Sequence, residues 1–215
     1  MNDQAILFFG KEQDAFVKIA LDFVQKNFHV CDIYLGNRKQ EFPFVQPEKN
    51  YSYIISYLSP WVIPAWILKK THIAAINFHP GPPEYPGIGC TNFAIYHGET
   101  HYGVTCHHME PQVDTGEIIA VKHFPVYKSD SVYSLTMRCY VTISVLFFEI
   151  MDLILRGNAL PMAKENWTRK PYQRKELEEL CKLDSKMNEA EIDRRIKATT
   201  FPDMPGAYFV QDQRA

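Results

Sequence analysis

The stretch AILFFGKEQDAFVKIALDFVQKNFHVCDIYL, from Ala5 to Leu35, decides the fold. It opens with an apolar run, residues 5–10, which ends in glycine and is typical of a buried parallel strand. Between residues 13 and 27 the apolar side chains recur at helical spacing, and residues 30–35 resemble a second strand. Strand, helix and strand in this order predict a βαβ unit and therefore a parallel sheet.

The rest of the chain continues this alternation of strands and helices. Four more β-prone runs are expected to form strands, the last two of them antiparallel to each other: residues 51–58, 73–78, 102–108 and 118–126. Short helices are expected at residues 64–70 and 91–97, and a long one from a cap at Ser129–Asp130 to Arg156. We predict an α/β fold with a Rossmann-like, mostly parallel sheet, helices on both faces and a short C-terminal α-rich extension.

Composition changes after Pro161, where charges of both signs become dense. We therefore expect a main domain over residues 1–160 and an extension over residues 161–215 that packs on the same domain. Asn188, with Glu191 three residues later, is expected to cap a helix in this extension.

Bulk composition excludes several classes of protein. With 46% hydrophobic and 22% charged residues and a net charge of -2, the chain has no basic field for nucleic acid or for an anionic membrane. Five cysteines, an odd number without a C-x-x-C pair, argue for a reducing cytoplasm over a disulfide framework. No leader is expected, and the most apolar run falls short of the ~20 residues of a membrane span.

Polar residues follow several of the expected strands, where ligands collect in an open α/β sheet. Asn77 and His79 are two apart on one strand and should point to the same side. Asp114 lies in a loop beside a glycine, and a carboxylate near an imidazole favours its charged form. An amide and an imidazolium together suit attack of a nucleophile on a carbonyl. The plainer interpretation is that these three polar residues are unrelated, because the sequence alone does not show that they lie close together in the fold.

A resemblance to a known family bears on that choice. The motifs N-F-H-P at Asn77–Pro80, Y-P-G at Tyr85–Gly87 and D-T-G at Asp114–Gly116 resemble those of formyltransferases that use folate, in order and in spacing. The resemblance covers residues 53–119 most closely and implies the formyltransferase fold for residues 1–160. It implies that Asn77, His79 and Asp114 are catalytic, acting as an amine attacks a formyl carbon to give a tetrahedral intermediate.

The same resemblance implies the formyl donor and its binding loops. The donor would be 10-formyltetrahydrofolate, leaving tetrahydrofolate as product. Its pterin would lie between a strand end and the loop before Asp114, where the implied contacts are Tyr57, Leu58, Ser59, Pro60, Ile63, Met109, Glu110, Pro111, Gln112 and Asp114.

The acceptor is implied by the form H-P-G-P-P-E-Y-P-G-I-G-C, residues 79–90, which looks most like nucleotide-sugar N-formyltransferases of surface-glycan (O-antigen) biosynthesis. The acceptor would be the amine of a dTDP- or GDP-linked amino-dideoxy sugar, held by Pro83, Tyr85, Gly87, Arg169 and Lys170. The basic residues equally suit a solvated charged face. A glycinamide ribonucleotide or methionyl-tRNA type of formyltransferase and a non-catalytic folate-binding module stay open, and a homodimer through the tail is expected.

Three other chemistries are less well supported by the sequence. A catalytic metal is not expected, because no H-E-x-x-H or paired C-x-x-C is present, although Cys106, His107 and His108 are adjacent. A dinucleotide site lacks its G-x-G-x-x-G after the first strand. A serine nucleophile lacks the G-x-S-x-G motif, and the cysteines have no evident adjacent base.

Overall fold

The computed structural model, which describes residues 2–210, contains a six-stranded sheet in the order β2-β1-β3-β4-β5-β6. The strands are β1 (Asn2–Lys11), β2 (Phe28–Gly36), β3 (Tyr51–Tyr57), β4 (Thr71–His79), β5 (His101–His108) and β6 (Ile118–Pro125). The first four are parallel, whereas β5 and β6 run antiparallel to their neighbours. The predicted fold class, with an antiparallel pair at the end, is confirmed.

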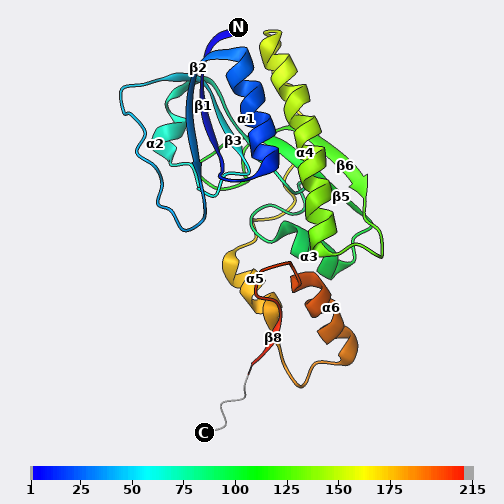
Figure 1. Cartoon of the computed structure of the whole chain (residues 1–215). Helices are drawn as coiled ribbons and strands as arrows, with labels where there is room; N and C mark the ends of the chain where they lie inside the picture. Colours follow the sequence, from blue (N-terminus) through cyan, green and yellow to red (C-terminus); the bar gives the residue numbers. More distant parts are fainter. Residues whose placement is uncertain (1, 211–215) are drawn as a thin grey trace.

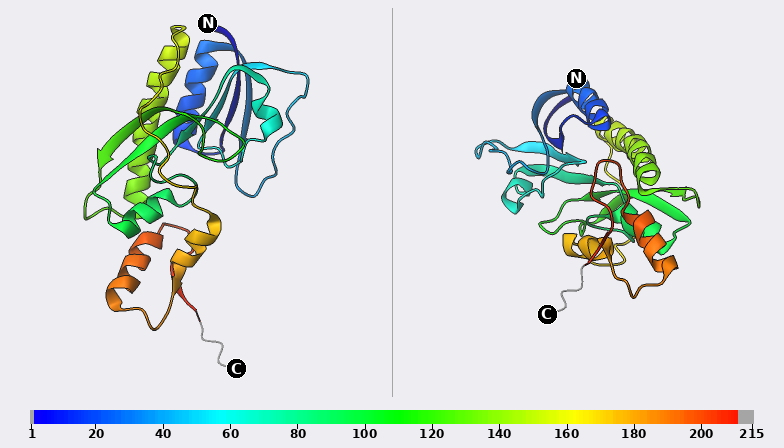
Figure 2. Two further views of the ribbon diagram at one scale, coloured as in Figure 1. Left: turned by 180° about the vertical axis from the view of Figure 1, so that it is seen from behind. Right: turned by 60° about the horizontal axis from the view of Figure 1, so that its bottom comes forward.

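Helices cover both faces of the sheet, but unequally (Figures 1 and 2). On one face α1 (Ala15–Asn27) and α4 (Val132–Leu155) lie side by side over the larger core. On the other face the short α2 (Ala65–Leu68) closes a smaller core. The remaining part of that second face, beside β4 and β5, is therefore free to carry a site.

The long helix α4 differs from its expected form at its start. Its N-cap is Ser131, which exchanges hydrogen bonds with Ser134, while Asp130 instead binds Arg138 and the Ser134 hydroxyl. Val141 and Val145 remain exposed on its outer side. No helix in the described part of the chain is long and apolar enough to cross a bilayer.

The C-terminal part forms a small layer against α3 (Cys90–His97) at the end of the molecule far from the N-terminus (Figure 1). It contains α5 (Arg174–Cys181), α6 (Glu189–Thr199) and a parallel pair, β7 (Lys182–Leu183) with β8 (Tyr208–Phe209). Asn188 caps α6 as expected, but the Glu191 side chain binds Tyr96 and two arginines and does not return to the cap.

Candidate active site

Four polar side chains of β4 and β5 form one corner of the sheet. In the antiparallel register Asn77 lies opposite His107, and His79 lies opposite Thr105. Their strand neighbours, such as Phe78 and Cys106, are buried in the core under α4. Alternation therefore directs all four polar side chains to the opposite face. The prediction that Asn77 and His79 share a side agrees with this arrangement.

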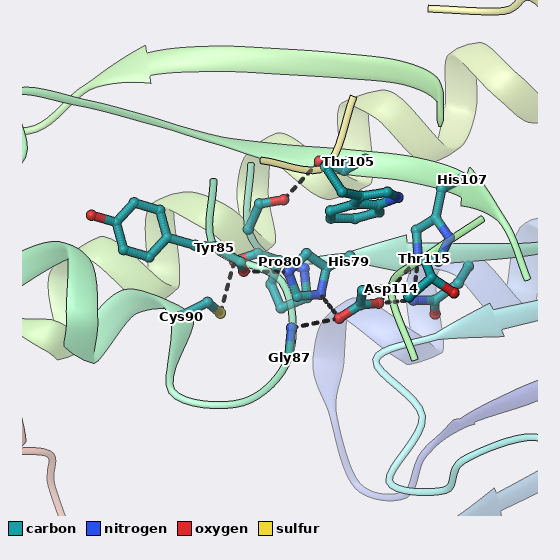
Figure 3. A network of polar contacts seen from close by, with 12 residues as sticks. His79, Pro80, Tyr85, Gly87, Cys90, Thr105, His107, Asp114 and Thr115 are labelled. Carbon is teal, nitrogen blue, oxygen red and sulfur yellow. Dashed lines mark hydrogen bonds and ion pairs between the residues drawn. The ribbon is translucent and has the colours of Figure 1, made fainter. Parts of the chain in front are cut away.

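Asp114 enters this corner from the loop after β5, where it contacts His79, His107 and Asn77 (Figure 3). One carboxylate oxygen, Oδ2, lies 3.2 Å from His79 Nδ1 and accepts the Gly87 main-chain N–H at 2.7 Å. The other, Oδ1, lies 3.1 Å from His107 Nε2 and 3.4 Å from Asn77 Nδ2. Asp114 has a left-handed φ of 48°, a conformation that turns its side chain into the corner and that clusters at functional sites.

The charge of this corner is set by its burial and its partners. Asp114 is only 4% exposed, and burial alone would favour the neutral acid. The His79 imidazole, then the hydrogen bond and charge of His107 and the Gly87 N–H, outweigh that effect and hold the pKa of Asp114 at about 2. The corner therefore contains a fixed carboxylate between two imidazoles at any pH near neutrality.

His107 belongs to this corner although the sequence analysis did not select it. It is 2% exposed, and its Nε2 lies 3.1 Å from Asn77 Nδ2 as well as from Asp114. Its other ring nitrogen is 2.7 Å from the His108 carbonyl oxygen, which fixes the ring. The signal was present in the alternation of β5, which places His107 on the face opposite Cys106, but only the pairing of β5 with β4 sets it beside Asn77.

A segment of residues 161–173, which we call the strap, crosses this corner between α4 and α5. Main-chain hydrogen bonds tie it to Ile118, Pro83, Pro86 and Ile88. Its Trp167 donates Nε1–H to the Gly116 carbonyl at 2.7 Å and packs edge-to-face with His79 and His107. Trp167 therefore forms one wall of the polar corner.

A cleft of about 1700 Å³ opens beside the corner and is lined by Asn77, His79, Asp114, His107 and Trp167. Most of the residues expected in the folate loops also line it, namely Leu58, Ser59, Pro60, Ile63, Met109, Glu110 and Gln112. Two others do not. Tyr57 is buried beneath the sheet with its hydroxyl 2.9 Å from Ser144 Oγ, and Pro111 is exposed outside the cleft.

The residues expected to hold the acceptor are divided between the cleft and its surroundings. Gly87, Arg169 and Lys170 line the cleft, whereas Pro83 and Tyr85 do not. Gly87 is required where it lies, because its φ is 89° and an added Cβ would come within 2.5 Å of the Tyr172 main chain.

Tyr172 and Arg169 have protein partners that limit their use as ligand contacts. The Tyr172 ring stacks on Phe93 at 3.8 Å and under the Arg169 guanidinium at 3.1 Å. Both faces of the Tyr172 ring are thus covered by protein groups. Arg169 also donates to Glu176 Oε1 at 3.0 Å, which offsets part of its charge. Within residues 2–210 no group of three or more His, Cys, Asp or Glu side chains is arranged to hold a metal ion.

Comparison with known proteins agrees with the fold. Residues 46–145 match the family described as Formyl transferase. The GDP-perosamine N-formyltransferase of Brucella melitensis is 29% identical over 155 residues, which are 72% of this chain and 59% of that protein. The chain therefore spans less than two thirds of this curated relative.

Two solved structures share the fold. A likely sugar N-formyltransferase from Mycobacterium tuberculosis, Rv3404c, has a TM-score of 0.76 at 23% identity, over 97% of this chain and 93% of that one. An N-formyltransferase from Helicobacter canadensis, solved with folinic acid and dTDP-3-aminofucose, has a TM-score of 0.71 at 17% identity, over 92% and 80%. The chain thus carries a region, residues 46–145, that matches the Formyl transferase family, and this region lies at the centre of the fold shared with these structures.

Proposed function

We propose that this protein transfers a formyl group from 10-formyltetrahydrofolate to the amino group of a nucleotide-linked amino-dideoxy sugar. The observation that carries the proposal is the corner in which Asn77, His79 and His107 all surround the Asp114 carboxylate beside a large cleft. The proposal is supported by the relative named for GDP-perosamine and by the neighbour solved with folinic acid and a dTDP-amino sugar.

The cleft has features that fit a folate. A pteridine needs flat apolar walls and main-chain groups that can pair with its edge. Val62 and Val113 line the cleft while 62% and 42% exposed, so apolar surface lies open on either side. Leu58 has a left-handed φ of 51°, unusual for a bulky residue, at the end of β3 beside the cleft. We propose that Leu58, Ser59, Pro60 and Ile63 on one side and Met109, Glu110 and Gln112 on the other hold the folate.

The residues of the corner account for the chemistry. The folate supplies the formyl carbon on its N10. We propose that the Asn77 amide donates a hydrogen bond to the formyl oxygen as this oxygen gains negative charge. The Nε2–H of His79 would be shared between the formyl oxygen and the Tyr85 main-chain carbonyl. Asp114 orients His79 through Oδ2, and the cleft has room for a water that would carry the proton from the attacking amine to the folate nitrogen that leaves as the formyl group is transferred.

Gly87 and the strap would meet the acceptor. We propose that Gly87, Arg169 and Lys170 contact the nucleotide sugar directly, whereas Pro83 acts by binding the strap through its carbonyl. Because Trp167 closes one side of the corner, we also propose that residues 1–160 and 161–215 function as one unit.

We also propose that the protein is cytoplasmic and that it forms a homodimer through its tail. All five cysteines are free thiols, which supports a reducing cytoplasm. A homodimer through the tail is supported by the exposed apolar side chains of Tyr208, Phe209 and Val210, and light scattering of the purified protein would test it.

The decisive experiment supplies both substrates. The protein is incubated with 10-formyltetrahydrofolate and a panel of dTDP- and GDP-linked amino sugars, with glycinamide ribonucleotide and methionyl-tRNA alongside. Mass spectrometry should detect one added formyl group on an amino sugar only. Formylation of glycinamide ribonucleotide or methionyl-tRNA instead would overturn the acceptor, and a folate-induced rise in Tm without any product would favour a binding module.

A further inference from the structure

We propose that the turn from Gly81 to Tyr85 is a positioning device for His79, in which the Tyr85 main-chain carbonyl holds the Nε2–H of the imidazole and Glu99 holds Tyr85. This inference rests on the proposed function, because it concerns how His79 is readied for formyl transfer. It gives Tyr85 and Glu99 a role behind the corner and not in contact with substrate.

The contacts of His79 define what the turn must supply. The ring nitrogens face two acceptors: Nδ1 is 3.2 Å from Asp114 Oδ2, and Nε2 is 2.9 Å from the Tyr85 carbonyl oxygen. A neutral imidazole has one N–H, so both contacts are hydrogen bonds only when the ring is doubly protonated. The titratable groups around the ring are Asp114 and, beyond it, His107, while Trp167 adds an uncharged edge.

Gly81 is needed for the contact between His79 and Tyr85. A Cβ added at residue 81 would lie 2.6 Å from His79 Nε2 and 2.8 Å from the Tyr85 carbonyl oxygen, closer than any such atoms approach. The Gly81 carbonyl is itself fixed by the Thr105 hydroxyl at 2.8 Å. The imidazole and the carbonyl can therefore meet only because residue 81 has no side chain.

Tyr85 is anchored at both of its ends. Its main-chain N–H donates to the Pro82 carbonyl, and its hydroxyl donates to Glu99 Oε1 at 2.6 Å and lies 3.0 Å from His97 Nδ1. Burial and the bond to Glu99 raise the pKa of this hydroxyl, so it remains a donor. The ring is 5% exposed and lies outside the lining of the large cleft, so it reaches the chemistry only through its carbonyl.

Three variants and one matched control test the device. Tyr85→Phe and Glu99→Ala each remove the same hydrogen bond and should lower kcat about fivefold, with KM for both substrates within about twofold. The double variant should be no worse than either single one. Glu84→Ala removes an exposed carboxylate from the same turn and should leave kcat unchanged.

A spectroscopic measurement separates positioning from a general loss of structure. In the wild-type protein, 15N-edited NMR should show a slowly exchanging Nε2–H proton on His79. Gly81→Ala should lose this signal and about tenfold in kcat while the other resonances keep their dispersion. Additive losses in the double variant, an equal loss in Glu84→Ala, or the absence of the Nε2–H signal in the wild type would each overturn the proposal. If no acceptor is formylated, the proposed function fails, but the ring signals still test the contact.

Discussion

Two buried aspartates of this molecule have similar electrostatics and different surroundings. Asp114 and Asp130 have side chains that are 4% and 5% exposed. Burial opposes ionisation of both, yet the pKa of each is held at about 2. For Asp130 the compensating groups are the Arg138 guanidinium, the Tyr127 N–H and the Ser134 hydroxyl.

The difference lies in the partners. Arg138 is a permanent cation bound in a bidentate fork, so Asp130 has one stable arrangement, which fixes the start of α4. Asp114 is surrounded by two imidazoles and an amide, groups that can gain, lose or redirect protons beside an open cleft. A lowered pKa thus does not distinguish the two carboxylates, whereas the titratable partners and the adjoining cleft set Asp114 apart.

The largest expected effect is on turnover. Asp114→Asn should lower kcat by ~1,000-fold, because it removes the carboxylate charge that orients His79. Asp130→Asn, the matched change at the structural carboxylate, should leave kcat per folded molecule within about twofold. Steady-state formylation assays, corrected for the folded fraction of each preparation, measure kcat of the two variants. Equal losses of kcat would contradict the distinction between the two aspartates.

Removal of His79 should have the next largest effect. His79→Ala should reduce kcat by ~100-fold or more while the circular dichroism spectrum and Tm stay close to those of the wild type. A parallel collapse of the fold would instead make His79 a structural residue like Arg138. Its matched control is His72→Ala, an exposed imidazole on the same strand.

Stability should respond most at Asp130. Asp130→Asn should lower the free energy of unfolding by about 1 to 2 kcal/mol at pH 7, a value reduced because Arg138 is partly open to solvent. The folded pKa lies below the ordinary 3.8, so this contribution is complete above pH 4 and is lost as the pH falls through about 2. Urea unfolding of both proteins at pH 7 and pH 2.5 should show the gap closing, and a constant gap would contradict the ion pair as its source.

The smallest expected effect concerns His107. His107→Gln keeps a polar group near Asn77 but loses the second imidazole, so kcat should fall about tenfold with KM little changed. A loss as large as that of His79→Ala would mean that His107 contacts the reacting atoms. An unchanged kcat would mean that His79 is the only imidazole beside Asp114 that matters for turnover.

The sequence was sufficient for the features that depend on local patterns. Alternating apolar runs predicted the sheet, and the two-residue spacing of Asn77 and His79 placed them on one face. It missed His107 because its role depends on antiparallel pairing between distant strands. It assigned Tyr85 to the acceptor because a turn motif does not reveal which way a ring points. The short helix α5 was also missed, since its charged residues lack a long apolar stripe.

The strap also bears on how the protein comes to be made. Synthesis delivers β4, β5 and Asp114 to the nascent chain well before Trp167 and Tyr172. The hydrogen bonds that Gly116 and Ile88 make with those two residues can form only once the ribosome has released the strap. Between the synthesis of Asp114 and that of the strap, the polar corner therefore lacks its Trp167 wall and stays open to water, even though all six strands of the main sheet have by then been made.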